Sequence, residues 1–105
     1  MTEPSTIADT VAGIARAVPG VAGLHSGMFG EVATYLPGRR VTGVRVHADQ
    51  IDVHISVRGD TGIRQTAAAV RAAVAAAVPG HRVDVTVEDL VPESPTDNHS
   101  TRRTS

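Results

Sequence analysis

Three side chains that could do chemistry alternate with apolar residues between positions 44 and 57. His47, Asp52 and His54 all fall on the polar side of the segment VRVHADQIDVHISV. Two imidazoles and a carboxylate could bind zinc or support general acid–base catalysis. Nothing in the surrounding sequence supplies a buried cleft, so polar pairs on a solvated sheet face are the favoured interpretation. We therefore predict no enzyme activity, no catalytic residues, no metal site and no cofactor.

A second candidate is the sequence GMFG at Gly27–Gly30. In KH domains a GxxG loop clamps the nucleotide backbone. That loop lies between two helices, whereas here the preceding segment has the pattern of a strand and Glu31 follows at once. A small KH-like nucleic-acid-binding module using this loop with Arg39, Arg40 and Arg45 is kept as the alternative function. Nucleic acid is not the expected partner.

The same stretch, residues 26–40, holds both aromatic residues of the chain, Phe29 and Tyr35. A glycine-punctuated loop that carries aromatic and arginine side chains is where a binding surface is expected. The candidate binding residues are Phe29, Tyr35, Arg39, Arg40 and Arg45. The structural alternative is that Phe29 and Leu36 close an open end of the core.

The elements that would position these residues follow from hydrophobic periodicity. Apolar residues at helical spacing predict helices over 7–18 and 63–78, each ended by a Pro-Gly pair. Apolar or alternating runs predict strands over 21–25 and 83–88. Phe29, Val32, Ala33 and Leu36 also fit one short helical face, which would end at Pro37-Gly38.

The alternation in 44–57 predicts a hairpin, because alternate residues of a strand point to opposite faces. Only a turn with an even number of residues sets apolar residues opposite apolar ones. With Asp49 and Gln50 as the turn, Val46 would face Val53 and His47 would face Asp52. In the same register, Val44 would face Ile55.

The predicted fold class is α+β: a small one-layer mixed sheet with two helices packed on one face, in the order α-β-β-β-α-β. We expect one domain over 5–91, preceded by a frayed lead over 1–4. Residues 92–105 are predicted to form a disordered tail, because the sequence there has no apolar side chains to bury.

Composition excludes several classes of function. The chain has 105 residues, with no cysteine and no lysine, so thiol chemistry is excluded. Its formal net charge of −1 gives no general argument for binding to nucleic acid. No apolar run approaches the roughly 20 residues that span a bilayer, and the first residues lack the pattern of a signal peptide. We expect a cytoplasmic protein without direct membrane insertion, which a membrane-anchored partner could hold near the membrane. A core with so few aromatic residues predicts marginal stability and hence a homo-oligomer.

In the order of its elements the chain resembles the alkaline shock protein family of bacterial envelope stress response proteins. The matching pieces are IARAVPGVAGLHSG (14–27), GVRVHADQIDVHISVRG (43–59), IRQTAAAVRAAV (63–74) and VDVTVEDLV (83–91). The resemblance implies a non-enzymatic interaction or scaffold protein linked to cell-envelope stress, which self-associates and is held near the membrane by a partner. Two features depart from the family: only Met1–Pro4 is available for its lead strand, and Arg58-Gly59 replaces its aromatic-glycine pair.

Overall fold

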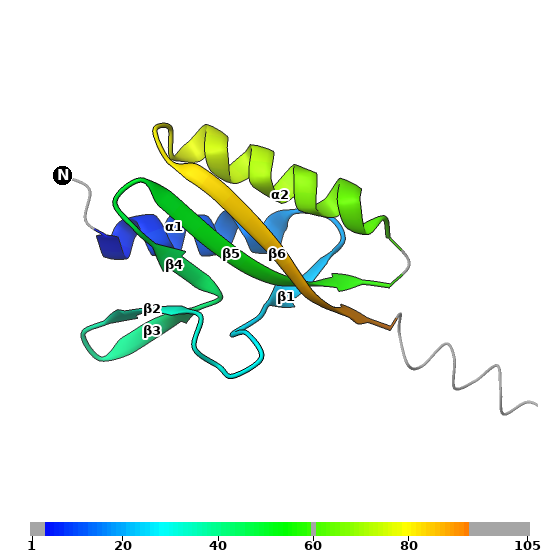
Figure 1. Cartoon of the computed structure of the whole chain (residues 1–105), viewed down its shortest axis with the longest axis horizontal. Helices are drawn as coiled ribbons and strands as arrows, with labels where there is room; N and C mark the ends of the chain where they lie inside the picture. Colours follow the sequence, from blue (N-terminus) through cyan, green and yellow to red (C-terminus); the bar gives the residue numbers. More distant parts are fainter. Residues whose placement is uncertain (1–3, 60, 93–105) are drawn as a thin grey trace, which may run out of the picture.

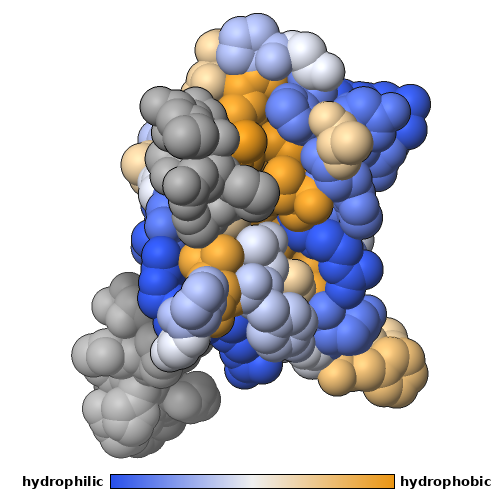
Figure 2. Space-filling view, turned by 90° about the vertical axis from the view of Figure 1, so that its left-hand side faces the viewer, coloured by the Kyte–Doolittle hydropathy of each residue, from blue (hydrophilic) through white to orange (hydrophobic). Residues whose placement is uncertain are grey.

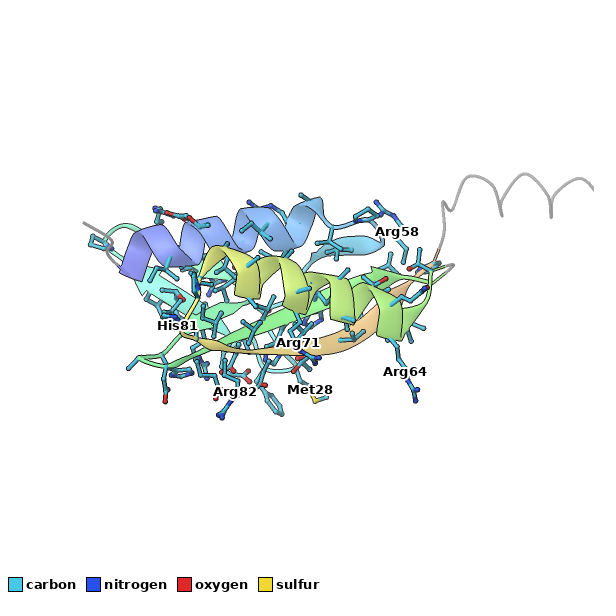
Figure 3. All side chains as sticks on the ribbon, turned by 90° about the horizontal axis from the view of Figure 1, so that it is seen from above. Met28, Arg58, Arg64, Arg71, His81 and Arg82 are labelled. Atoms are coloured by element: carbon cyan, nitrogen blue, oxygen red, sulfur yellow. The ribbon has the colours of Figure 1, made fainter. Side chains whose placement is uncertain are left out.

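The structure is a computed structural model that describes residues 4–59 and 61–92. It has two helices and six strands, with both helices on one side of the main sheet (Figure 1). The elements are α1 (Pro4–Ala17), β1 (Val21–Leu24), β2 (Ala33–Leu36), β3 (Arg39–Thr42), β4 (Val44–Val46), β5 (Gln50–Arg58), α2 (Ile63–Ala77) and β6 (Arg82–Val91). The predicted α+β class is confirmed, and so is the placement of two helices on one face of a mixed sheet (Figure 3).

Strand β5 is the centre of the main sheet. β1 and β4 pair antiparallel with two successive stretches along one edge of β5, and β6 pairs with its other edge in parallel. Helix α2 forms the crossover between the parallel strands β5 and β6, as such a connection requires. The chain between β1 and β4 leaves this sheet and returns to it, and the candidate binding residues lie on this excursion or just after it.

The 26–40 stretch differs from the prediction. It contains no helix; β2 and β3 form a separate two-stranded hairpin, which stands off the main sheet in Figure 1. Pro37 and Gly38 make its turn instead of ending a helix, and the positive φ of Gly38 (76°) suits the third position of a type II turn. In so short a segment the spacing of apolar residues fits both a helical turn and a hairpin. The turn at Pro37-Gly38 favours the hairpin. The observed order is therefore α-β-β-β-β-β-α-β.

The β4–β5 hairpin is present, but its register differs by two residues from the predicted one. Val44 faces Val53 and Arg45 faces Asp52, so the turn lies at Ala48-Asp49. The backbone N–H of His47 donates to the Gln50 carbonyl across this turn, and the Asp49 carbonyl accepts a hydrogen bond from Arg82, the first residue of β6. Both registers oppose apolar to apolar side chains, so the alternation alone could not choose between them.

The core lies between the helices and the sheet. Alternate residues of β5, Ile51, Val53, Ile55 and Val57, are fully buried. The helices add small and β-branched side chains to the same layer: Ala8, Val11, Ala15, Val70 and Val74. Figure 2 looks onto one end of the two layers, where apolar atoms reach the surface between hydrophilic flanks.

The predicted lead and tail fall largely on residues 1–3 and 93–105, which lie outside the described part of the chain. Helix α1 begins at Pro4, whose fixed φ suits the first turn of a helix. Neither helix of the described residues is long and apolar enough to cross a membrane.

Candidate interaction surface

The turn at Gly27–Gly30 carries the most exposed large apolar side chains of the described chain. Met28 is 80% exposed and Phe29 is 86% exposed. Phe29 therefore does not close the core, and that alternative is wrong for this residue; Leu36 does pack against the core. We call Gly27–Gly30 the Met28–Phe29 turn.

The backbone holds this turn in one shape. Gly30 donates a backbone hydrogen bond to the Gly27 carbonyl (3.1 Å), and Gly27 donates to Nδ1 of His25 (2.9 Å). Gly27 is buried with a φ of 91°, and a Cβ there would lie 2.9 Å from a methyl carbon of Val32. Only glycine fits such a position without a shift of its neighbours. Met28 and Phe29 are thus presented on an ordered turn.

Arg45 supports the turn from the sheet. Its guanidinium donates a hydrogen bond to the backbone carbonyl of Glu31, just after the turn. The backbone of Val32 donates to the Ser26 carbonyl (2.8 Å), which closes the base of the loop. Arg45, predicted as a binding residue, is placed where it stabilises the loop that carries Phe29.

Arg39 has a different partner, on helix α1. Its Nη1 and Nη2 donate to the two carboxylate oxygens of Asp9 at 3.0 and 2.8 Å, a bidentate ion pair. The hydrogen bond from Arg39 holds the pKa of the Asp9 carboxyl below its ordinary value, and Asp9 raises the pKa of Arg39 in return. This pair joins the β2–β3 hairpin to α1.

A groove of about 540 Å³ runs between α1 and β3. Asp9 and Arg16 are two helical turns apart with Ala12 between them, so they share one face of α1. We call this feature the arginine groove; its lining residues are Asp9, Ala12, Arg16, Leu24, Arg39, Arg40, Val41 and Thr42. Three arginine residues and one aspartate line it, so the formal charge of its lining residues is positive.

The five predicted binding residues therefore do not form one site. Phe29 and Arg45 belong to the Met28–Phe29 turn and its support, whereas Arg39 and Arg40 line the arginine groove. Tyr35 is 66% exposed on β2 and faces Arg40 across the hairpin. No hydrogen bond within residues 4–59 and 61–92 joins Tyr35 to the turn.

The polar residues of the β4–β5 hairpin are divided between two pairs. Nε2 of His47 lies 3.1 Å from a carboxylate oxygen of Asp52, and Nδ1 of His54 lies 2.5 Å from Glu88 on β6. Among the described residues no group of three potential metal ligands occurs. This arrangement agrees with the predicted polar pairs on a sheet face.

Asp52 is the most constrained member of these pairs. Burial by itself raises the pKa of its carboxyl. Hydrogen bonds from Gln50 and His47, together with the charges of His47 and His54, lower this pKa by a larger amount, so the net shift is downward. The Gln50 amide donates to Asp52 at 2.7 Å and also to Asp84 on β6 at 2.9 Å. These hydrogen bonds join Gln50 and Asp52 on β5 to Asp84 on β6 and to His47, which follows β4.

The GxxG sequence is not placed as a KH loop. The turn at Gly27–Gly30 lies between strands β1 and β2, not between two helices. Arg45 is turned toward the Glu31 carbonyl and Arg39 toward Asp9, so neither is free to follow a nucleotide backbone. The geometry does not favour the nucleic-acid alternative.

No protein-family model and no curated protein sequence matches the chain. Among solved structures it is similar to several forms of the MamM CTD. One point variant is 21% identical, with 81% of this chain and 95% of that chain covered and a TM-score of 0.54. A second variant is 20% identical (85% and 100% covered, TM-score 0.56), and a fragment is also 20% identical (83% and 99% covered, TM-score 0.55). The fold is that of the MamM C-terminal domains.

The resemblance to the alkaline shock protein family is therefore wrong. The solved structures that share this fold are MamM C-terminal domains, and no family model supports the predicted membership. The error has a physical reason: short valine-rich strands and alanine-rich helices in this order satisfy the packing of many small α+β domains. The pieces at 43–59 and 83–91 show a period of two, which specifies strands and no particular family.

Sequence reasoning missed Met28, Asp9 and Arg16. Met28 lies beside Phe29 between two glycines, and this turn signal could have indicated that both side chains are exposed. Asp9 and Arg16 gave no local signal, because their role depends on β3, which lies more than twenty residues further along the chain.

Proposed function

We propose that this chain is a non-enzymatic interaction domain that self-associates through the Met28–Phe29 turn and joins a larger partner. The observation that carries the proposal is the exposure of Met28 and Phe29, at 80% and 86%, on a hydrogen-bonded turn. On the polar face of the sheet, His47 is paired with Asp52 and His54 with Glu88.

Large apolar side chains such as Met28 and Phe29 are few in this chain, yet both of these are exposed. The chain has one phenylalanine, and its core is built from valine, isoleucine, leucine and alanine instead. An exposed aromatic or methionine side chain that enters a pocket on a partner buries a large apolar area, and a few such residues supply most of the affinity of an interface. An ordered turn also loses little conformational entropy on binding.

The fold likeness supports a role beside a larger protein. The similar structures are C-terminal domains, and the chain spans between 95% and 100% of their length. We carry this to the present chain as a proposal: a cytoplasmic domain that a membrane-anchored partner holds at the membrane. The fold likeness gives no support to a link with envelope stress.

Sedimentation velocity across the micromolar range tests the self-association. The variant Met28→Ser/Phe29→Ser removes the apolar tip from the turn and leaves both flanking glycines in place. Leu90→Ser is the matched control, because Leu90 is 49% exposed on β6, at the edge of the sheet. Wild type and control should rise above the monomer mass with concentration, whereas the double variant should stay monomeric.

The control also separates the proposal from its main competitor. β6 forms one edge of the main sheet, and an exposed edge strand can pair with another chain. Loss of association in Leu90→Ser, with association kept in Met28→Ser/Phe29→Ser, would place the interface at β6 and contradict the proposal. A wild type that remains monomeric throughout would also contradict it.

A further inference from the structure

The arginine groove is separate from the Met28–Phe29 turn and is lined by different residues. We propose that this groove docks an acidic peptide segment of the partner protein. The inference rests on the proposed function, since it concerns the partner that an interaction domain would hold. It is carried by the charge and the shape of the groove and by the elements that line it.

Charge is the first argument. Arg16, Arg39 and Arg40 line the groove, and Asp9 is its single acidic lining residue. Asp9 is engaged by Arg39 through both carboxylate oxygens. Within residues 4–59 and 61–92 neither Arg16 nor Arg40 has a carboxylate partner, so their guanidinium groups remain available for an anion. The chain as a whole carries a formal charge of −1, which makes this surplus a local feature.

The two elements that carry the arginines are joined to each other. Arg39 joins β3 to α1 through its bidentate pair with Asp9, which is exposed on both sides. Arg40 follows Arg39 on β3, and Arg16 lies in the last turn of α1, so rigid elements carry both available arginines. Guanidinium groups recognise carboxylates through planar, directed hydrogen bonds.

Shape and apolar lining favour a peptide. The groove, at about 540 Å³, falls within the roughly 300–1,000 Å³ typical of binding sites, and it is open along one side. Leu24 and the 7% exposed Val41 give it an apolar floor between the charged groups. An extended peptide could lay carboxylates on Arg16 and Arg40 and a small apolar side chain on this floor.

Single-stranded nucleic acid fits less well. Proteins that hold single strands combine basic residues with aromatic side chains on which the bases stack. The lining residues of the arginine groove include no aromatic side chain. Tyr35 lies on the neighbouring strand but does not line the groove.

Fluorescence anisotropy with a labelled hexaglutamate peptide tests the inference, with hexaglutamine as the neutral probe. The groove variant is Arg16→Gln/Arg40→Gln, which leaves the Asp9–Arg39 pair intact. The matched control is Arg64→Gln/Arg71→Gln, which removes the same charge from exposed positions on α2 (Figure 3). We expect hexaglutamate binding to weaken about tenfold in the groove variant, as the loss of two exposed ion pairs would give. Binding should be unchanged in the control.

Three results would overturn the inference. These are equal weakening in both double variants, no binding of hexaglutamate at low salt, and tighter binding of a single-stranded oligonucleotide than of the peptide. The titration is repeated in Met28→Ser/Phe29→Ser, where unchanged peptide affinity is expected. Peptide binding and self-association are therefore scored independently, and circular dichroism verifies that each variant is folded.

Discussion

Arg45 on β4 donates a hydrogen bond to the backbone carbonyl of Glu31 and thereby joins the main sheet to the loop that carries Phe29. Through this contact a residue of the main sheet stabilises the backbone next to an exposed turn. The Met28–Phe29 turn depends on this support as well as on its own glycines.

Substitution of Arg45 by glutamine should loosen the turn without unfolding the domain. Loss of the hydrogen bond to Glu31 should speed amide hydrogen exchange at Gly30 and Val32, whose N–H groups close the turn and its base. The free energy of unfolding should fall by about 1 kcal/mol or less, as is usual for one exposed hydrogen bond. Arg40→Gln is the control, and equal exchange rates in the two variants would contradict the supporting role of Arg45.

Gly43, between β3 and β4, should not tolerate a side chain. Its φ is 83°, and a Cβ would lie 2.8 Å from the Leu24 Cβ and 3.1 Å from the His54 carbonyl oxygen. The left-handed conformation and the clash together should lower the unfolding free energy of Gly43→Ala by roughly 2–4 kcal/mol. Urea denaturation measures this loss.

Gly23 on β1 provides the comparison for that experiment. A Cβ built there meets nothing within 4 Å, and its φ is not positive. Gly23→Ala should therefore stay within about 0.5 kcal/mol of wild type. If both alanine variants had the same stability, the close approach of β1, β4 and β5 at Gly43 would be disproved.

The lowered pKa of Asp52 predicts a stability difference that depends on pH. Because the folded state lowers this pKa, the carboxylate contributes stability above its ordinary value of 3.8, and that contribution is lost as the pH falls through the folded pKa. Asp52→Asn should cost about 1 kcal/mol at neutral pH and less at about pH 3. Urea denaturation at both pH values measures the change.

Asp49→Asn is the control for Asp52, since the Asp49 side chain in the turn makes no hydrogen bond within the described residues. Its effect should be small at both pH values. If the difference in unfolding free energy between wild type and Asp52→Asn became larger at low pH, the sign would be opposite to the prediction. That result would refute the assigned hydrogen bonds from Gln50 and His47.

The sequence was sufficient to predict the elements whose signals are local. Helices expected over 7–18 and 63–78 are found at Pro4–Ala17 and Ile63–Ala77, because apolar spacing and a Pro-Gly pair lie within each segment itself. The α+β class and the shared helix face followed from the same patterns. The stretch 26–40 was mispredicted because its apolar residues suit a helix turn and a short hairpin equally.

The candidate surfaces depended on contacts that no local pattern contains. Phe29 was chosen for its type and neighbours, but its exposure became visible only once the turn was placed outside the core. The arginine groove joins Asp9 and Arg16 on α1 to Arg39 on β3, and the ion pair that joins the two elements spans thirty positions of sequence. Prediction of such a groove needs the packing of the hairpin on the helix.

Self-association through the Met28–Phe29 turn is tested most directly by the methyl signal of Met28. The chain has two methionines, so selective ¹³C labelling of methionine methyl groups gives separate signals for Met1 and Met28. On concentration from dilute solution the Met28 signal should shift or broaden in step with the rise in mass, while the Met1 signal serves as the reference. A Met28 signal that stays constant while the mass rises would contradict the account.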